Sequence, residues 1–383
     1  MSLSYNDTGI RQRVLENVRR VVVKVGTRLL TGVDGVSKGE RVEQLIAQIA
    51  RLRDRGIEVI LVSSGAIGAG MRILNTAKRP ASLPRLQAHA AVGQSRLMYL
   101  YETAGAKHGF HCGQMLLSTA DVQDRERHLN IASCMNALLA AGVLPVVNEN
   151  DSVSVDEIKF GDNDTLAAMV ALLARADLTI LLTAVDGLHH RDGDQLGKRV
   201  SVVDEVTDEI RAMAGDTEDR NTSIGGMISK LAAADTVTRA GEPLWIADGR
   251  DFGVLQAVFD GKDVGTVFRA VSDTRMRGHK RYLAFFSAPA GALVIDDGAV
   301  HALQAERGAS LLPKGIADVR GQFGKGDTVR ILAPDESEVG RGISNFDSDE
   351  ILKIKGCHTR DINGILGYDA YDCIVHRDYL AVI

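Results

Sequence analysis

The chain has 383 residues, too many for one ordinary core, which predicts two domains, and its composition of 45% hydrophobic and 25% charged residues is typical of a soluble globular protein. The net charge of −5 argues against binding nucleic acid along the whole chain, and no stretch approaches the ~18 uninterrupted apolar residues of a membrane span. The absence of a signal-peptide pattern and four dispersed cysteines without zinc-binding spacing predict a cytoplasmic protein with reduced thiols.

Strand-like and helix-like segments alternate through the first two-thirds of the chain. The β-branched run Val18–Val25 predicts a strand, Lys38–Arg55 carries its apolar residues on one helical face, and Ile57–Val62 is again strand-like. The pattern continues with a long helix near Pro84–Ala106, strands ending near Leu116, Val147 and Thr183 with a helix after each, and strands at Glu242–Ala247 and Gly265–Phe268. Such alternation predicts an α/β fold: a three-layer α/β/α domain whose mainly parallel sheet is covered by helices on both faces.

The alternation stops in two places. Between about Gly187 and Ile224 the sequence is charged and rich in glycine, which predicts a hairpin or a mobile flap. After a basic stretch at 269–281, short strand-like pieces alternate with glycine turns around one helix at Asp297–Arg307, which predicts a small β-barrel-like domain. These pieces are Gly291–Ile295, Asp318–Phe323, Thr328–Leu332, Gly340–Ser344 and Cys373–His376.

The predicted organisation is an N-terminal tail at 1–15, the α/β domain at 16–268, a linker at 269–289 and the β-rich domain at 290–383. The last segment has 10 Lys and Arg against 15 Asp and Glu, and the other residues balance at 35 against 35. The whole net charge therefore lies in the C-terminal domain.

Two polar runs bracket one loop. Asn148–Asp151 follows the strand that ends at Val147, and Gly161–Asp164 precedes a helix-like segment rich in Ala and Leu. Such residues can hold a ligand ammonium group by carboxylate, orient a ligand carboxylate by amide donors and place a cation-binding Asp nearby. The alternative is a polar loop with a helix N-cap, since Asn and Asp are preferred caps. Two runs around one loop favour the ligand site.

Other polar residues also follow predicted strands, where ligands bind in open α/β sheets. Lys24 lies in an apolar strand, close before Gly26 and Thr27. It could be a lysine at a sheet edge whose side chain reaches solvent, or it could contact a phosphate. The nearby Gly and Thr favour the phosphate contact. Ser64–Ala66 opens a helix, where backbone N–H groups could bind an oxyanion. The alternative is that Ser64 is simply a helix cap. The run from Gly225 to Lys230 resembles a phosphate cradle, although the P-loop pattern and the dinucleotide fingerprint are both absent. These features together indicate phosphoryl transfer to a small anionic acceptor.

Six motifs in the first 230 residues form a specific set. They are Val22–Thr27, Ser63–Gly70, Ala91–Gln94, Val147–Asp151, Gly161–Asp164 and Gly225–Lys230. Together they closely resemble the glutamate 5-kinase family. The resemblance covers 16–268 as an amino acid kinase domain and extends to a C-terminal PUA domain through the characteristic run Arg307–Gly315.

The resemblance implies ATP-dependent phosphorylation of the γ-carboxylate of L-glutamate, the first step of proline biosynthesis, with Mg²⁺ as cofactor. Proline as a feedback inhibitor and a homo-oligomer, either dimer or tetramer, are also implied. The catalytic residues would be Lys24, Lys230, Asp164 and Asp162, with the two lysines stabilising the transferring phosphoryl group and Asp164 organising them. The glutamate-binding residues would be Ser64, Gly65, Ala66, Asn148, Asp151 and Asn163, with Asp151 suited to the α-ammonium group.

The ATP site implied by the resemblance is lined by Lys24, Gly26, Thr27, Thr183, Ala184, Ile224, Gly225, Gly226, Met227, Ile228, Ser229 and Lys230. No side chain is assigned as a direct metal ligand. Two positions depart from the family pattern: Ala184 stands where Asp is usual, and Ser223-Ile224 replaces the usual Gly-Thr before the glycine pair. Neither departure touches the lysines or the Asp cluster, so we expect activity.

Two rival hypotheses remain. Another amino acid kinase, acting on N-acetylglutamate or aspartate, is disfavoured by Asp151 and by the PUA domain, and an assay with each acceptor decides. An RNA-binding protein is the rival from another class, because PUA domains commonly bind RNA; the acidic charge of 290–383 argues against it. Binding to neither RNA nor a membrane is expected.

Overall fold

We describe the fold from a computed structural model of the chain, at residues 8–30, 37–153, 163–192, 195–214, 226–272, 275–276, 278–305 and 308–383. The chain divides into two compact units, one of residues 1–122 and 126–275 and one of residues 123–125 and 276–383. No helix among the described residues is both long and apolar enough to cross a membrane. The domain boundaries drawn from the sequence stay predictions.

The larger unit is built on an eight-stranded sheet with the strand order β3-β4-β2-β1-β5-β9-β10-β8. Its strands are β1 (Arg20–Val25), β2 (Glu58–Val62), β3 (Cys112–Leu117), β4 (Leu144–Glu149), β5 (Leu178–Thr183), β8 (Val202–Val203), β9 (Leu244–Asp248) and β10 (Thr266–Phe268). The described pairings are parallel except for that between β9 and β10. The prediction of a mainly parallel sheet is confirmed.

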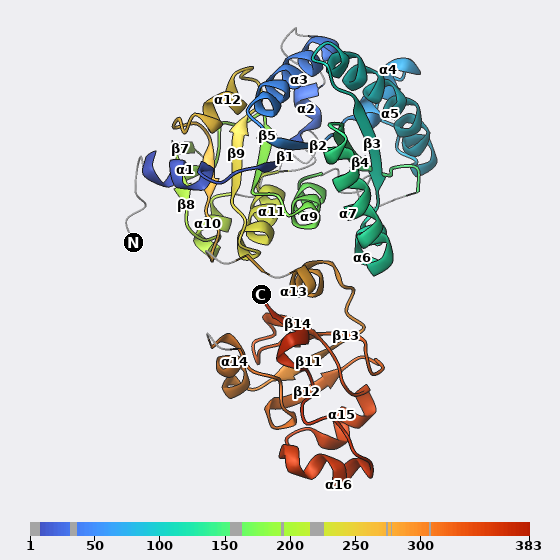
Figure 1. Ribbon diagram of the computed structural model, residues 1–383, viewed down its shortest axis with the longest axis vertical. Coiled ribbons are helices and arrows are strands. Elements are labelled where there is room, and N and C mark those ends of the chain that lie inside the picture. The colour runs from blue at the N-terminus through green and yellow to red at the C-terminus, as the bar shows by residue number, and fades with distance from the viewer. Residues whose placement is uncertain are drawn as a thin grey trace. The chain divides into compact units, whose positions relative to one another are not determined.

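Helices cover both faces of this sheet, as Figure 1 shows: α3 and α12 lie on one side of β1 and β5, and α9 and α11 on the other. The helices of this unit are α1 (Thr8–Leu15), α2 (Thr27–Leu30), α3 (Lys38–Asp54), α4 (Ala66–Ile73), α5 (Leu83–Ala106), α6 (Thr119–Gln123), α7 (Arg125–Ala140), α9 (Asp164–Ala174), α10 (Asp208–Ala212), α11 (Met227–Arg239) and α12 (Val254–Phe259). The predicted three-layer α/β/α architecture is confirmed.

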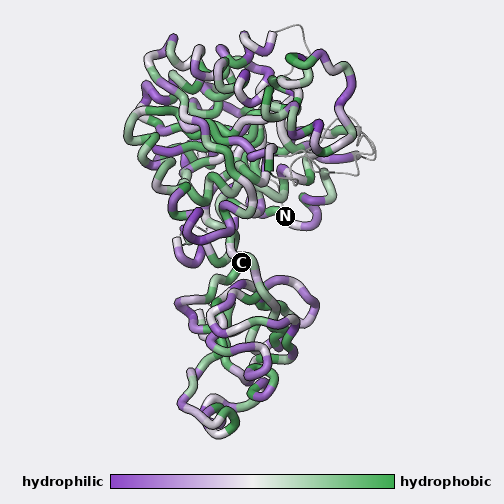
Figure 2. Tube along the Cα trace, turned by 90° about the vertical axis from the view of Figure 1, so that its right-hand side faces the viewer, coloured by the Kyte–Doolittle hydropathy of each residue, from purple (hydrophilic) through white to green (hydrophobic). Residues whose placement is uncertain are grey.

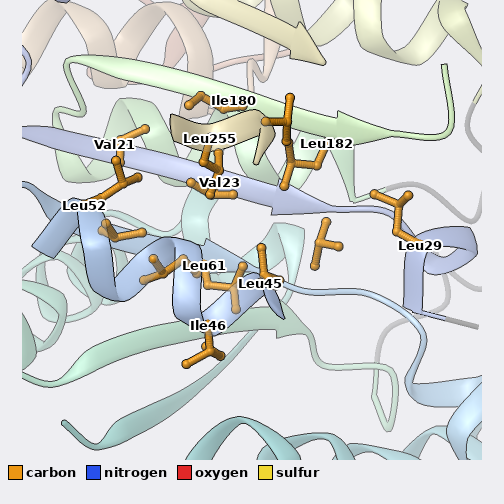
Figure 3. Close-up of a cluster of buried hydrophobic side chains, with 14 of the residues drawn as sticks. Val21, Val23, Leu29, Leu45, Ile46, Leu52, Leu61, Ile180, Leu182 and Leu255 are labelled. Carbon is orange, nitrogen blue, oxygen red and sulfur yellow. The ribbon is translucent and has the colours of Figure 1, made fainter. Parts of the chain in front are cut away.

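The core on the α3 side explains the spacing of the apolar residues. Alternate β1 residues Val21 and Val23 gather with Leu45, Ile46 and Leu52 of α3 (Figure 3). Burial of each such side chain contributes about 1.5–3 kcal/mol. Because successive strand side chains point to opposite faces, Lys24 lies on the α9 side. Figure 2 shows the trace coloured by hydropathy, with hydrophobic residues gathered in the interior of this unit.

The N-terminal stretch expected as a tail contains helix α1. Its Arg11 is 1% exposed and donates from Nη1 to the carbonyl of Val264 at 2.7 Å and from Nη2 to that of Ser201 at 3.0 Å. Asp263 adds an ion pair at 2.9 Å. Burial lowers the pKa of Arg11 to about 10. The stretch 8–15 is therefore part of the folded unit, which its short, weakly patterned sequence did not reveal.

A hairpin was predicted between Gly187 and Ile224, and strands β6 (His189–Asp192) and β7 (Gln195–Arg199) form one. Strand β8 and helix α10 follow it, and residues 215–225 lie outside the described part of the chain. The hairpin is thus confirmed by the pairing of its two strands, at 189–192 and 195–199.

The smaller unit has a five-stranded mixed sheet with the order β12-β11-β13-β14-β15. Its elements are α13 (Gly278–Arg281), a π-helix (Tyr282–Phe286), β11 (Gly291–Ile295), α14 (Asp297–Gln304), β12 (Ile316–Arg320), β13 (Thr328–Leu332), β14 (Glu338–Ile343), α15 (Ser348–Ile354), α16 (Ile362–Leu366) and β15 (Leu380–Val382). Short 3₁₀ turns lie at Pro313–Gly315, Thr359–Asp361 and Arg377–Tyr379.

Two predictions about this unit were wrong. The sequence predicted one helix after the linker, but α15 and α16 follow α14. Helix α15 has a capping box between Asp347 and Glu350 and buries Ile351 and Ile354, yet its seven residues are too few to display a helical period. The predicted strand at Cys373–His376 contributes only an isolated bridge, between Leu311 and Val375.

Candidate active site

One buried carboxylate bridges two lysines. Asp164 is fully buried; its Oδ1 lies 2.5 Å from Lys24 Nζ and its Oδ2 lies 2.8 Å from Lys230 Nζ. Lys24 and Lys230 are 5% and 6% exposed. Charge-assisted contacts of this length are strong in a desolvated site, so Asp164 fixes where both ammonium groups lie.

Three elements bring these charges together. Lys24 stands near the carboxyl end of the inner strand β1, between Val62 of β2 and Leu181 of β5. Asp164 is the first residue of α9, and Lys230 lies in the first turn of α11, which packs against α9. The positive ends of two helix dipoles therefore point toward the same end of the sheet, an arrangement that favours anions.

Ser229 extends this cluster. Its Oγ lies 3.1 Å from Asp164 Oδ2 and 2.8 Å from the carbonyl of Gly226, the N-cap residue of α11. The start of α11 is thereby tied to the carboxylate that holds the lysines.

A second, uncharged network adjoins the first through Asn163. Its Nδ2 lies 2.5 Å from the carbonyl of Ser63, 3.0 Å from Ser64 Oγ and 2.8 Å from Asn148 Oδ1. Asn148 in turn donates to Gln94 Oε1 at 2.9 Å. Four segments of the chain, each buried here, meet in this network.

The carbonyl oxygen of the Asn163 side chain has no hydrogen-bond partner among the described residues, although Asn163 is only 1% exposed. An unsatisfied buried acceptor costs about 1–3 kcal/mol, so such groups are rare unless a ligand satisfies them. A ligand donor such as an ammonium group would do so.

Two buried carboxylates follow Asn148 in the chain. Glu149 ends β4 and is 6% exposed, and Asp151 is 9% exposed. Burial, followed by repulsion from Glu149, raises the pKa of Asp151 to about 6, while Arg79 acts against this rise. Paired buried carboxylates attract a cationic group.

Glycines shape both the turn at Gly65 and the packing of the helix that follows it. Gly65 has φ +88° and is the N-cap of α4, a conformation that favours glycine. A Cβ at Gly70 would lie 1.8 Å from the carbonyl oxygen of His89, and one at Gly93 would lie 1.8 Å from that of Ala66. These glycines let α4 and α5 touch, which places Ala66 beside the segment that carries Gln94.

The described residues among those expected to line an ATP site fall at the same sheet end. Gly26 donates to the carbonyl of Leu182 at 3.3 Å, Thr27 opens α2, and Thr183 ends β5 and is followed by Ala184. Gly226 precedes α11, whose first turn carries Met227, Ser229 and the exposed Ile228. Asp162, Ile224 and Gly225 lie outside the described residues.

Comparison with known proteins shows which family the chain belongs to. The model of the amino acid kinase family matches residues 19–248, and that of the PUA domain matches residues 291–366. The chain belongs to the amino acid kinase family. It is 44% identical to a glutamate 5-kinase of Trichlorobacter lovleyi over 98% of this chain and 99% of that protein, and 43% identical to one of Thermus thermophilus over 96% and 98%.

Solved structures show a weaker likeness. A carbamate kinase from Giardia lamblia bound to AMP-PNP has a TM-score of 0.46 and 17% identity, covering 66% of this chain and 99% of its own. A UMP kinase from Bacillus anthracis has a TM-score of 0.45 and 15% identity, covering 68% and 99%.

The structure thus brings together Lys24, Asp164 and Lys230 in one cluster, and Ser64, Asn148 and Asn163 in another, adjoining it. Sequence analysis assigned no role to Gln94, although it lies in one of the quoted motifs, nor to Glu149. The sequence likewise gives no signal, beyond a helix start, that Lys38 at the beginning of α3 is only 6% exposed.

Proposed function

We propose that this protein transfers the γ-phosphoryl group of ATP to the γ-carboxylate of L-glutamate, forming L-glutamyl 5-phosphate and ADP, as the first step of proline biosynthesis. The bridge from Lys24 through Asp164 to Lys230 is the observation that carries the proposal. Phosphoryl transfer depends on positioning and on charge stabilisation, and two fixed ammonium groups supply both.

In this mechanism a γ-carboxylate oxygen attacks the γ-phosphorus, and the bond from phosphorus to the β,γ-bridging oxygen breaks. Lys24 and Lys230 stabilise the negative charge on the transferring group, and Asp164, with Asp162, holds them in place. No proton needs to move, since glutamate attacks as a carboxylate and ADP leaves as an anion. This fits a cluster whose described charged members are two lysines and one carboxylate.

Glutamate is held by the neighbouring network. Asp151 pairs with its α-ammonium group, which also donates to the unpartnered Asn163 Oδ1. Ser64 Oγ, Asn148 and the backbone at Gly65 and Ala66 orient its carboxylates. A desolvated carboxylate such as Asp151 selects a free amino group, which N-acetylglutamate lacks.

ATP lies against Lys24, Gly26, Thr27, Thr183, Ala184 and the start of α11 in this proposal, with residues 224–230 around the phosphates. Mg²⁺ neutralises phosphate charge when bound. The described residues contain no group of three or more His, Cys, Asp or Glu that could hold a metal. The ion would be held through the nucleotide phosphates, as Mg²⁺ commonly is, and no side chain is assigned as its direct ligand.

The proposal includes feedback inhibition by proline, assembly into a dimer or tetramer, and a cytoplasmic location. It also includes the domain boundaries 16–268 and 290–383. The resemblance to glutamate 5-kinases supports these points.

The test measures ADP release from ATP with and without glutamate, and traps the acyl phosphate with hydroxylamine as the γ-hydroxamate. N-acetylglutamate and aspartate replace glutamate in parallel reactions. We expect the hydroxamate to form when glutamate is the acceptor and not when N-acetylglutamate or aspartate replaces it. Equal turnover with N-acetylglutamate or aspartate, or none with glutamate, contradicts the proposal.

A further inference from the structure

Lys38 is a buried ammonium group that the proposed mechanism does not use. It is the first residue of α3, after the N-cap Ser37, and is 6% exposed. Its Nζ lies 3.5 Å from the carbonyl oxygen of Gly65, at the outer limit for a hydrogen bond. Within the described part of the chain, no carboxylate lies within 4.0 Å of it.

The surroundings of Lys38 are electropositive. It stands at the positive end of the α3 dipole and beside the N-cap of α4, and Arg72 lies close enough to repel it. The acceptor it faces already receives a hydrogen bond from Ala69 N at 3.0 Å. Burial, followed by Arg72, lowers the pKa of Lys38 to about 7. A buried cation without a carboxylate is costly unless an anion joins it.

The position of Lys38 relates it to the phosphoryl end of the site. A Cβ at Gly65 would lie 3.6 Å from Thr27 Cγ2, so the Gly65 turn packs against the segment that follows Lys24 and β1. The residue before this turn, Ser64, contacts Asn163 at 3.0 Å. Lys38 is therefore beside a turn that contacts Thr27, three residues after Lys24, and that follows Ser64 of the amide network.

We propose that Lys38 binds the acceptor: its ammonium group pairs with the γ-carboxylate of the acidic amino acid as that group meets the phosphoryl donor. This inference rests on the proposed function. The γ-carboxylate and the γ-phosphate of ATP are both anions, and their approach is opposed by repulsion that a nearby ammonium group reduces. The end that carries the α-amino group lies toward Asp151, which leaves the γ-carboxylate for the Thr27 side.

The experiment compares Lys38→Met, which keeps the length of the side chain without its charge, with wild type. The matched control is Lys107→Met, because Lys107 is exposed and its ion pair, with Glu43, is exposed too. We expect kcat/KM for glutamate to fall at least about 30-fold in Lys38→Met, with less than about 3-fold change in the Kd of ATP. Lys38→Arg should recover part of the loss, and Lys107→Met should behave as wild type.

Folding is checked by thermal unfolding without ligand. Lys38→Met should melt at or above the wild-type temperature, because an uncompensated buried charge is removed, while the rise in Tm produced by glutamate should shrink. A purely structural lysine would instead give a lower Tm and an unchanged Kd for glutamate.

Two amides of glutamate identify the carboxylate. Glutamine lacks the γ-carboxylate and isoglutamine lacks the α-carboxylate, so each is tested as a competitive ligand. We expect Lys38→Met to weaken isoglutamine as much as glutamate and to leave glutamine unchanged. If Lys38→Met instead weakens the binding of glutamine and leaves that of isoglutamine unchanged, the assignment to the γ-carboxylate is overturned.

The possible failures are distinguishable. If wild type forms hydroxamate from glutamate and Lys38→Met matches it in kcat/KM and in Kd, the role of Lys38 is overturned and the proposed function stands. If wild type forms none, the proposed function is overturned, and this inference with it.

Discussion

Lys24 Nζ and Asp164 Oδ1 lie 2.5 Å apart although 140 residues separate them in the chain. The same carboxylate reaches Lys230, 66 residues further on. A single residue at a helix start therefore links β1, α9 and α11 and holds both ammonium groups of the site in position.

Replacing Lys24 or Lys230 by Ala should lower kcat by about 10²-fold or more, since each removes a positive charge aimed at the transferring phosphoryl group. The remaining lysine still pairs with Asp164, so the fold should survive. Steady-state kinetics and circular dichroism check this. Near-normal turnover in a folded variant would remove that lysine from the mechanism.

Asp164→Ala should reduce both activity and stability. Without the carboxylate, two buried ammonium groups face each other, and breaking a buried ion pair costs about 3–5 kcal/mol. Denaturant unfolding measures the loss. The control is Asp235→Ala, because Asp235 pairs with Arg211 and Arg239 on the surface, where ion pairs contribute about 0–1 kcal/mol. Equal losses in the two variants would contradict the bridging role.

Binding of glutamate should depend on the ionisation of Asp151. Its pKa is raised to about 6, so the carboxylate pairs with the substrate ammonium above that pH and becomes neutral below it. We expect kcat/KM for glutamate to fall as pH decreases from 7 to 5, and Asp151→Asn to raise KM for glutamate more than that for ATP. If Asp151→Asn shows the same pH dependence of kcat/KM as wild type, the titrating group is not Asp151.

The same raised pKa predicts the opposite effect on the ligand-free protein. A carboxylate that is harder to ionise in the folded state than in the unfolded state costs stability above its folded pKa. This cost should be present above pH 6 and disappear as pH falls toward 4. Asp151→Asn should accordingly raise the Tm of the ligand-free protein at pH 8.

Gly93→Ala should disturb the site through packing alone. The new Cβ would lie 1.8 Å from the carbonyl oxygen of Ala66, a backbone atom, so α4 and α5 must separate. We expect a loss of about 2 kcal/mol or more in unfolding free energy, together with weaker glutamate binding. Gly39→Ala is the control, because its Cβ would meet only Ser37 Oγ at 3.9 Å. A variant as stable as this control would show that the helices have room to adjust.

The C-terminal domain should not act as a general RNA binder. Its segment 290–383 carries 15 acidic against 10 basic side chains, so its mean field repels a polyanion. The full-length protein at micromolar concentration should show no salt-sensitive RNA binding in a filter or anisotropy assay. Tight binding that weakens as salt rises would revive the RNA hypothesis and direct attention to the basic stretch at 269–281.

Local patterns in the sequence determined most of the larger unit. Alternating β-branched strands and amphipathic helices are local signals, and they placed β1, α3, β2 and β9 to within a few residues. The polar runs at strand and helix ends likewise marked Asn148, Asn163 and Asp164. Weakly patterned pieces such as α1, α15 and α16 were missed, because their five to eight residues span at most little more than two helical turns.

Only the tertiary structure decided which of these residues meet. The order of strands put Lys24 between β2 and β5, and the packing of α9 on α11 brought Asp164 to both lysines. Lys38 appears in the sequence as an ordinary lysine at a helix start, and its burial beside Gly65 depends on how the start of α3 lies against the Gly65 turn. Composition and periodicity report which face of an element is apolar, but burial and distance depend on neighbours that are remote in the chain.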